Sequence, residues 1–391
     1  MNGRAMRRIL GLLSVLGLSA CATTPGVRGE AALESALRDM CHSEVALLGE
    51  TGDHGSARTI EAKAWLVRRL VDECGFTALF FEGSSYDFLE LERRRRRGDP
   101  AGRAELASAI GGLWNRAAEM QPLIDFLDQR WAAGRLRLGG IDDQLGSAGA
   151  FYSLAAMPAE FAALLPPDRG DPCRGELRRL IYGQVGAAPA ERAPVLSCLA
   201  ELRAALARHA PGEERAERLH LLDNIDRYAA RIGSGDTDYV RGRGRSMWLN
   251  FRWLRGRLPR GSKIILWAAT VHVARDARAF PMFAQGGNLG SYLAPAYGRR
   301  AFVLGFAAAS GRYRSGGEER VIATRVGGSI EAAALAGADA DVAYLGRSAL
   351  RRIGRQPAGL FTHEPAVADW SRIVDGAIVF KEERAPTQIP R

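Results

Sequence analysis

The sequence lacks the short motifs that mark the commonest hydrolase mechanisms. It has no Gly-x-Ser-x-Gly turn to present a serine nucleophile and no His-Glu-x-x-His pair for catalytic zinc. It also has no Cys-x-x-Cys or Cys/His spacing typical of structural zinc. After the first 20 residues, no stretch is apolar for long enough to cross a bilayer, and no internal repeat is evident. These absences argue against a serine hydrolase of the usual α/β kind, a zinc protease, a membrane-spanning protein and a repeat protein.

The first 20 residues have the pattern of an export signal. Three arginines within residues 1–8 precede an apolar run over residues 9–18. Ten helical residues rise about 15 Å, which is half of the ~30 Å bilayer core, so this run is too short to span it. The run leads into a tetrapeptide that is similar to a lipobox, Leu18-Ser19-Ala20-Cys21. We expect cleavage before Cys21 and lipid on its sulfur; an ordinary signal peptide with a chance cysteine is the alternative.

The expected mature protein begins with a short tether, residues 21–30, which is small and polar. Ala22 follows the lipidated position, where an aspartate would favour retention at the inner membrane. We therefore expect a lipid-anchored protein of the bacterial cell envelope, on the periplasmic side of the outer membrane. The anchor would be the lipid alone.

Positive charge is in excess throughout the chain. The sequence has 54 basic and 44 acidic side chains, a net charge of +10, and loss of the three arginines of the signal would leave +7. Arginines are densest at residues 93–97, which we expect to form a solvated helix end or loop, with weak attraction to anionic lipid head groups as the alternative. Because no nucleic-acid-binding module or aromatic interleaving accompanies the charge, we expect no nucleic-acid partner.

Four cysteines remain after Cys21, namely Cys41, Cys74, Cys173 and Cys198. An even number in an oxidising compartment allows two disulfides with three connectivities. Proximity in sequence favours pairing the first cysteine with the second and the third with the fourth.

Hydrophobic periodicity predicts an α/β fold. A buried strand at 44–49, an amphipathic helix at 56–74 and a second strand at 76–81 form a βαβ unit, which implies a parallel sheet. Further helices are expected at 31–40, 102–111 and 118–133, and further strands at 136–141, 263–268, 301–306, 320–324 and 376–380. Residues 148–235 show three or four helical patterns and no clear strand. The sequence therefore predicts one three-layer α/β domain over residues 31–385, with a mostly parallel sheet and a helical insertion at 148–235.

Acidic and imidazole side chains follow four of these strands. In strand order, they are Glu50 and His54, then Glu82, then Asp142 and Asp143, then His272 with Arg275 beside it. In open α/β sheets, sites form beyond the carboxyl ends of parallel strands, so we expect these groups to converge. Because no serine stands in an obvious nucleophile setting, histidine and carboxylate together suit direct activation of water. Two histidines and two carboxylates could also hold a metal ion, which is the chemical alternative.

In their order along the chain, these residues resemble the motifs of the erythromycin esterase family. Its Gly-Glu-x-x-His-Gly loop is similar to residues 49–55, which have one extra residue before the histidine. The following helix also matches, with Lys63 at a basic position. The remaining similar segments are the strand end at 81–83, the Gly-x-Asp-x-Gln segment at 140–144, the Arg-x-x-x-Met-x-x-Asn-x-x-Trp-Leu helix at 243–254 and the His-Asn-x-His-Val-Ala strand end at 269–274. The resemblance covers most of the expected domain.

The resemblance implies a metal-independent hydrolase of an ester or lactone that needs no cofactor. It assigns His54 as the general base for water, Glu50 and Glu82 as its carboxylate partners, and His272 as a second active-site imidazole.

Three further residues are expected to contact a small-molecule substrate. Arg243 resembles a pocket arginine of the family, while Asp142 and Arg275 are candidates from their places beyond strand ends. One departure bears on this pocket: Ala269 and Thr270 stand where the family has histidine and asparagine. We expect another group to replace the lost imidazole, with Arg275 and Arg243 as the candidates.

A non-catalytic alternative is a haem- or ligand-binding envelope lipoprotein, because the loop at residues 49–55 is also similar to that of ChaN-like haem-binding lipoproteins. The other four histidines lie outside any motif and are expected to be surface or satisfied core residues; they are His42, His209, His220 and His363. The tryptophans at helical positions, Trp114, Trp131 and Trp253, are expected to be core residues rather than a stacking platform.

Overall fold

The computed structural model describes residues 30–99, 102–145, 151–325, 327–336 and 341–390. The expected signal peptide and nearly all of the expected tether lie outside the described residues. None of the described helices combines the length and the hydropathy that a membrane span requires.

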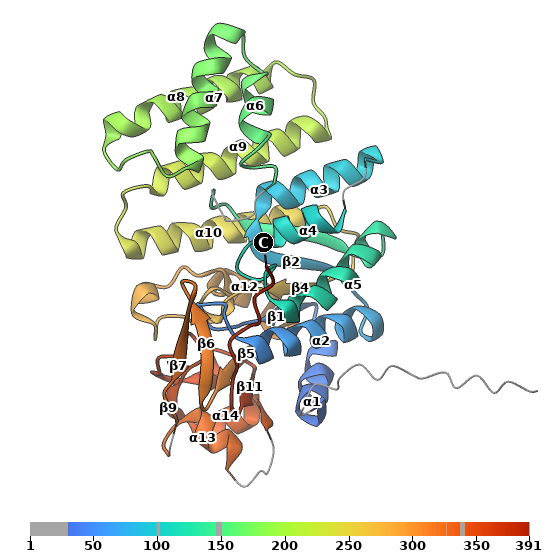
Figure 1. Ribbon diagram of the computed structural model, residues 1–391, viewed down its shortest axis with the longest axis vertical. Helices are drawn as coiled ribbons and strands as arrows, with labels where there is room; N and C mark the ends of the chain where they lie inside the picture. Colours follow the sequence, from blue (N-terminus) through green and yellow to red (C-terminus); the bar gives the residue numbers. More distant parts are fainter. Residues whose placement is uncertain (1–29, 100–101, 146–150, 326, 337–340, 391) are drawn as a thin grey trace, which may run out of the picture.

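A seven-stranded sheet forms the centre of the molecule (Figure 1), with the strand order β3-β2-β4-β1-β5-β11-β8. All neighbouring strands are parallel except β8, which pairs antiparallel with β11 at one edge. The strands of this sheet are β1 Val45–Leu48, β2 Phe76–Ser84, β3 Arg137–Asp142, β4 Lys263–Trp267, β5 Ala301–Ala308, β8 Val342–Gly346 and β11 Gly376–Phe380. The predicted α/β class with a mostly parallel sheet is therefore confirmed.

The sheet is covered by helices on both faces, and its central strands are largely apolar because both faces are buried. Alternate residues of β1 divide between two cores: Ala46 and Leu48 belong to one, and Val45 and Leu47 to the other. The first core is shared with α1 Glu30–Cys41, α2 Ala57–Glu73, α4 Arg103–Ile110, η1 Ala118–Met120 and α5 Gln121–Ala132. The second is shared with α10 Asp236–Arg255, α11 Thr270–Val273, η2 Pro281–Phe283, α12 Leu289–Tyr297, α13 Ile330–Leu335, α14 Arg347–Ile353 and η4 Trp370–Arg372.

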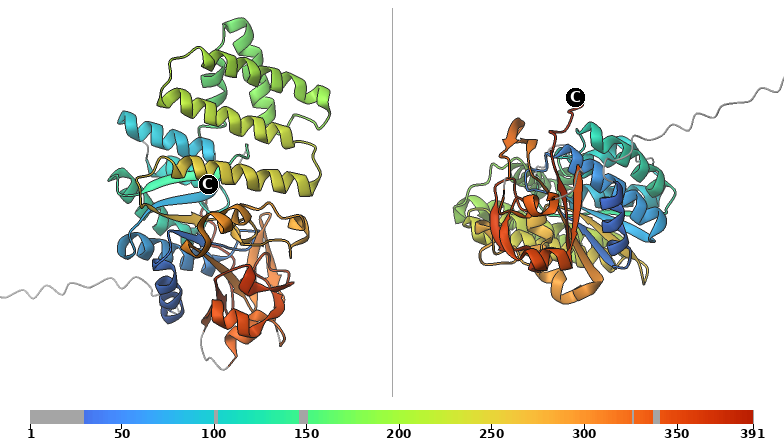
Figure 2. Two further views of the ribbon diagram at one scale, coloured as in Figure 1. Left: turned by 180° about the vertical axis from the view of Figure 1, so that it is seen from behind. Right: turned by 90° about the horizontal axis from the view of Figure 1, so that it is seen from below.

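A helical block lies at one end of the sheet, and the left view of Figure 2 shows it at the opposite end of the molecule from the C-terminal strands. Its helices are α6 Met157–Ala162, α7 Pro167–Ile181, α8 Pro189–Ala207 and α9 Glu213–Arg231. They enclose a third core, to which α3, Ser85–Arg97, contributes Tyr86 and Leu89. These helices fall within the range expected for the insertion, whereas its limits as a separate unit stay a prediction.

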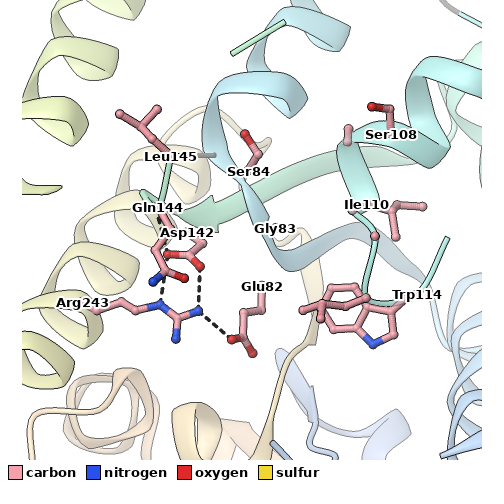
Figure 3. Close-up of a pocket in the computed structure, with 14 residues that line it drawn as sticks. Glu82, Gly83, Ser84, Ser108, Ile110, Trp114, Asp142, Gln144, Leu145 and Arg243 are labelled. Carbon is pink, nitrogen blue, oxygen red and sulfur yellow. Dashed lines mark hydrogen bonds and ion pairs between the residues drawn. The ribbon is translucent and has the colours of Figure 1, made fainter. Parts of the chain in front are cut away.

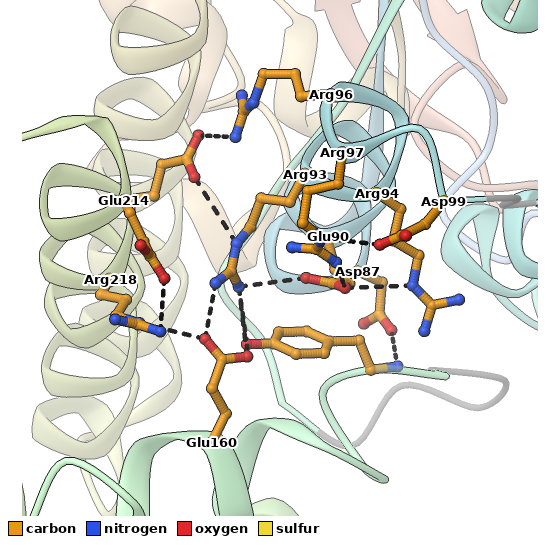
Figure 4. Close-up of polar contacts among 12 residues, drawn as sticks. Asp87, Glu90, Arg93, Arg94, Arg96, Arg97, Asp99, Glu160, Glu214 and Arg218 are labelled. Carbon is orange, nitrogen blue, oxygen red and sulfur yellow. Dashed lines mark hydrogen bonds and ion pairs between the residues drawn. The ribbon is translucent and has the colours of Figure 1, made fainter.

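The arginine run at residues 93–97 is the last part of α3, and the expectation that it is solvated is wrong for Arg93. Its side chain is buried and forms ion pairs with Glu160 of α6 at 2.8 Å and with Glu90 at 3.2 Å. Arg96 pairs with Glu217 of α9 at 2.6 Å. Figure 4 shows the contact of Arg93 with Glu160, which joins α3 to the helical block. The run therefore holds the block to the rest of the domain.

Both disulfides favoured by the sequence are present. Cys41 pairs with Cys74, and Cys173 with Cys198, each with a Cα–Cα distance of 5.1 Å. The first joins the ends of α1 and α2, while the second joins α7 to α8 within the helical block.

Several C-terminal strands were not predicted. The strand expected at 320–324 is β7 Glu318–Ile322, which pairs with β6 Gly311–Ser315 in a separate hairpin. β8 of the main sheet was missed, as was a second two-stranded sheet made of β9 Arg355–Ala358 and β10 Ala366–Asp369. These strands are short and largely half-buried or exposed, so they lack the apolar runs that mark the central strands.

Candidate functional site

The carboxyl ends of four adjacent strands carry the candidate residues. Glu50 and His54 lie in the loop between β1 and α2, Glu82 lies near the end of β2, and Asp142 is the last residue of β3. His272 belongs to the short helix α11 that follows β4. The register of β2 against β3 shifts between residues 81 and 84, at the position of Glu82. Such irregularities re-aim side chains, and they are frequent beside active sites.

The first half of the site is built on the Glu50 carboxylate. Its Oε1 lies 3.0 Å from His54 Nδ1, accepts a hydrogen bond of 2.9 Å from Trp114 Nε1, and lies 3.2 Å from Lys63 Nζ. The ammonium of Lys63 also lies 4.1 Å from the centre of the Trp267 ring. Glu50, Lys63 and Trp114 are at most 1% exposed. The predicted contact between His54 and a carboxylate is therefore confirmed, and a buried cation supports it.

The charges around Glu50 determine how its neighbours ionise. Burial opposes ionisation of Glu50, but the adjacent Lys63 and His54 outweigh it and lower its pKa. Burial lowers the pKa of Lys63 to about 8, against the opposing effect of Glu50. For His54, burial is opposed by the hydrogen bond to Glu50 and by the charge of Glu82, and its pKa is raised. The imidazole therefore sits between two carboxylates that favour its protonated form.

His54 is held in an uncommon backbone conformation. It is the one described residue other than glycine with a positive φ, of 60°. This region of the map disfavours most side chains, and such residues persist only where their surroundings hold them. Because Nδ1 is taken by Glu50, Nε2 is the ring nitrogen that remains for a water molecule or substrate.

The second half of the site is built on Glu82 and Arg243 of α10 (Figure 3). One guanidinium nitrogen of Arg243 lies 2.8 Å from Glu82 Oε1 and 2.7 Å from Asp142 Oδ2. His272 Nε2 lies 3.1 Å from Glu82 Oε1 and 3.0 Å from Arg243 Nη1. Burial opposes ionisation of Glu82, but His272 and Arg243 outweigh it and hold the pKa of the carboxyl well below its usual value. Glu82 acts electrostatically on His54 too, so it links the two halves.

The segment after β4 in which Ala269 and Thr270 replace the histidine and asparagine of the family still contributes to the second half of the site, through its backbone. The amide of Ala269 donates a hydrogen bond of 2.8 Å to Glu82 Oε2. Of the two groups expected to replace the lost imidazole, only Arg243 belongs to the cluster. Arg275 instead binds Asp375 and the backbone carbonyls of Gly298 and Ala301. Its expected contact with substrate is therefore not supported by its position.

A cavity of about 440 Å³ opens beside the second half of the site. Glu82, Asp142 and Arg243 form its polar wall, and Leu113 and Trp114 belong to its more apolar side. Leu113 is 57% exposed, so its side chain is available for contact with a ligand in this cavity. Volumes of a few hundred cubic ångströms are typical of small-molecule sites.

Three members of the site were not assigned from the sequence. Lys63 was noted only at a basic position, although it stands on the apolar face of α2 with Ile60 and Val67, which was a usable signal. Trp114 is the core residue expected, but its indole also fixes Glu50. His363 contacts the loop that carries His54, and nothing around it in sequence indicates this. Asp143 pairs with Arg231 rather than joining the site.

In the part of the chain that the structure describes, no three His, Cys, Asp or Glu side chains are grouped as metal ligands would be. The Glu82 and His272 atoms that a metal would need are instead in contact with the guanidinium of Arg243.

Solved structures with similar folds cover nearly the whole chain. A Bacillus cereus protein is 18% identical with a TM-score of 0.73, and the match covers 94% of this chain and 96% of that one. A succinoglycan biosynthesis protein is 15% identical with a TM-score of 0.68, covering 92% of each chain. A mutant of the erythromycin esterase EreC in its open conformation is 17% identical with a TM-score of 0.66, covering 92% of this chain and 95% of that one. At these identities the likeness shows the fold alone.

The fold is a three-layer α/β fold, and at the edge of its sheet each of two histidines contacts a carboxylate, His54 that of Glu50 and His272 that of Glu82. Its sequence matches the erythromycin esterase family over residues 71–372, well over half of its length. The chain belongs to the erythromycin esterase family, and membership supports ester hydrolase activity rather than the haem-binding alternative. None of the curated proteins compared with the chain matches it in sequence.

Proposed function

We propose that the protein hydrolyses an ester or lactone with a water molecule activated by His54. The observation that carries the proposal is the buried contact between His54 Nδ1 and Glu50 Oε1, 3.0 Å long, with Lys63 and Trp114 on the same carboxylate oxygen. A carboxylate in this position holds the imidazole tautomer that leaves Nε2 as a proton acceptor. Membership of the esterase family supports the same reaction class.

In this mechanism, a water molecule at His54 Nε2 loses a proton to the imidazole as its oxygen attacks the carbonyl carbon. A new C–O bond forms, and the carbonyl π electrons move to the oxygen to give a tetrahedral oxyanion. Glu50 stabilises the imidazolium that results. Collapse of the oxyanion breaks the bond to the alcohol, which takes the proton back from His54. The products are an acid and an alcohol, or a hydroxy acid from a lactone.

The second half of the site has the groups to stabilise the oxyanion. Arg243 is a permanent cation that lines the cavity. Fixed donors in a water-poor site act strongly because they need no reorganisation as charge develops. Glu82 and Asp142 hold Arg243 in place from two sides.

Hydrolysis of a panel of esters and lactones by the full chain in detergent, beside His54→Ala, tests the proposal. We expect the substitution to lower kcat by about 10²–10⁴, the usual contribution of a general base. His209→Ala is the matched control, because His209 is exposed and lies in the helical block. Equal rates for wild type and His54→Ala on every substrate cleaved would contradict the proposal.

We also propose that the protein works in the cell envelope, anchored through lipid on Cys21. The support is the basic and apolar N-terminus and its lipobox-like end, Leu18-Ser19-Ala20-Cys21. Expression in a bacterial host with a labelled fatty acid should label the protein, and Cys21→Ser should remove both the label and the association with membranes. Membrane association that persists unlabelled in both forms argues against the anchor.

A further inference from the structure

The loop that carries His54 is held by segments from the other end of the chain. The amide of Gly52 donates to the Phe361 carbonyl at 2.9 Å, and the amide of Arg314 donates to the Gly55 carbonyl at 2.8 Å. Contact at Gly55 is so close that a Cβ there would lie 1.8 Å from the Arg314 carbonyl oxygen. Arg314 belongs to β6, and Phe361 lies in the connection between β9 and β10; β6 and β9 are labelled in Figure 1. The loop is therefore positioned by tertiary contacts rather than by its own sequence.

His363 supplies the side chain at the centre of this contact. It is buried, and its Nε2 lies 3.1 Å from Ser56 Oγ and 3.3 Å from Thr51 Oγ1, one residue on each side of the His54 turn. Thr51 Oγ1 donates in turn to Asp53 Oδ1 at 3.0 Å. The back of the imidazole is covered by the Tyr313 ring, with 4.1 Å between ring centres.

The grouping of Ser56, His363 and Asp53 is not a nucleophilic triad. In a triad the serine and the acid use different ring nitrogens, whereas here both face Nε2, at 3.1 Å and 3.7 Å. Ser56 is 3% exposed and precedes the first turn of α2, so its hydroxyl is closed to substrate. Burial and the nearby Arg325 also lower the pKa of His363 to about 4, so it is neutral near pH 7. A neutral imidazole whose Nε2 contacts the hydroxyls of both Thr51 and Ser56 is suited to holding the loop that carries His54.

We propose that His363 is a positioning residue that keeps the His54 imidazole against Glu50. The loop has one more residue between Glu50 and His54 than the family motif, and it places His54 at a φ of 60°. A longer loop has more conformations, and this strained one needs outside contacts to be the stable choice. His363 links both ends of the turn, so its loss frees His54 to move away from Glu50.

The kinetic test rests on the proposed hydrolysis and uses His363→Ala, with His220→Ala as its matched control. His220 is also a largely buried imidazole, with a pKa lowered to about 3 by burial, but it stacks on Trp253 away from the loop. We expect His363→Ala to lower kcat by about 10–100-fold with little change in KM, since a shift of about 1 Å in a catalytic group has this scale of effect. His363→Asn, which can still bond both hydroxyls, should recover part of the loss.

A kcat for His363→Ala equal to that of wild type, or an equal loss in His220→Ala, overturns the proposal. If the alanine variant fails to fold, the same comparison is made between His363→Asn and a His363→Leu variant, which fills the space without polar atoms.

A second measurement does not depend on any substrate. The chain has six histidines, so the ring signal of His54 can be assigned by NMR from single substitutions. Burial and Lys63 lower the pKa of His54, but the hydrogen bond to Glu50 and the charges of Glu50 and Glu82 outweigh them, so the pKa is raised; Asp53 lies in the same loop. Release from Glu50 should therefore move its titration midpoint down towards the ordinary value in His363→Ala, but not in His220→Ala. An unchanged midpoint overturns the positioning role, whereas a shifted midpoint without ester hydrolysis overturns only the proposed function.

Discussion

Two arginines with little exposed surface, each among carboxylates, have different surroundings in this molecule. Arg243 lies 2.8 Å from Glu82 and 2.7 Å from Asp142, at the edge of the sheet. Arg93 lies 2.8 Å from Glu160 and 3.2 Å from Glu90, between α3 and the helical block. As ion pairs the two are alike. The Arg243 cluster differs in that it contains an imidazole, His272, and borders a cavity of about 440 Å³.

Buried ion pairs by themselves therefore do not identify a site. A buried charge must be paired because leaving it alone in the interior is very unfavourable, and this holds for structural and catalytic clusters alike. What separates them is access for a ligand and the presence of an imidazole, a side chain that can both accept and donate a proton. Both features occur where the strands end, whereas the contacts of Arg93 join helices.

The largest difference in kcat between the candidate site and the Arg93 cluster should come from Glu50→Gln, which keeps the shape of the side chain but removes its charge. We expect kcat to fall by about 10⁴, the effect known for amide replacement of a carboxylate that orients a catalytic histidine. Ester hydrolysis at saturating substrate measures it. Glu160→Gln in the Arg93 cluster is the control and should leave kcat unchanged; equal losses in both variants would remove the distinction between the candidate site and the Arg93 cluster.

Replacing each arginine by lysine tests the two clusters directly. Arg243→Lys keeps a positive charge but loses the planar fork that binds Glu82 and Asp142 together. We expect kcat/KM to fall by about 10²–10³, the scale for a lost oxyanion donor. Arg93→Lys should leave kcat/KM of the folded protein unchanged. A wild-type rate for Arg243→Lys would remove Arg243 from the mechanism.

Arg93→Met should act on stability alone. It removes the cation that Glu90 and Glu160 share. Because Arg94 and Arg97 still pair with Glu90, and Arg218 with Glu160, the cost should be smaller than the loss of about 3–5 kcal/mol for a buried pair that is broken outright. Urea denaturation followed by circular dichroism measures the free energy of unfolding, while the activity per folded molecule should stay constant. The surface variant Arg278→Met, whose partner Asp276 is local, provides the baseline. A loss no larger than that baseline would show that the Arg93 contacts contribute little.

A smaller effect on kcat/KM is expected from pH, and it should arise from two groups of the candidate site, His54 and Lys63. The pKa of His54 is raised above 6.5, so the unprotonated base, and with it kcat/KM, should decline as pH falls through a value above 6.5. Lys63, with a pKa of about 8, should give the alkaline limb, since its neutral form no longer supports Glu50. Lys63→Met should remove that limb from the profile of kcat/KM between pH 5 and 10. An alkaline limb unchanged in Lys63→Met would contradict this assignment.

Much of the sheet could be predicted because its strands are continuous apolar runs. All six strands expected outside the short one at 320–324 lie in the parallel part of the sheet, within a few residues of their expected bounds. The strands β6, β8, β9 and β10 could not be predicted in the same way. β8 lies at an edge of the sheet and the two hairpins lie outside it, so their side chains are half exposed and show no clear alternation.

The candidate site was predictable where it depended on strand ends. Glu50, His54, Glu82 and His272 follow from the rule that parallel strands bring their carboxyl ends to one edge. Arg243 was found by resemblance rather than by that rule, because it lies on a helix. Arg275 satisfied the rule by sequence position but turns to Asp375, and the rule says nothing of side-chain direction.

By itself, the sequence determined the α/β class, the parallel centre of the sheet, the pairing of cysteines near in sequence and the types of side chain at the sheet edge. These follow from local patterns, since burial on both faces requires apolar strands and parallel order brings their ends together. Only the tertiary structure decided that Arg93 is buried, that Lys63 and Trp114 share the oxygen of Glu50, and that His363 braces the His54 loop. Each of these depends on contacts between residues far apart in the chain, whose distances no local pattern encodes.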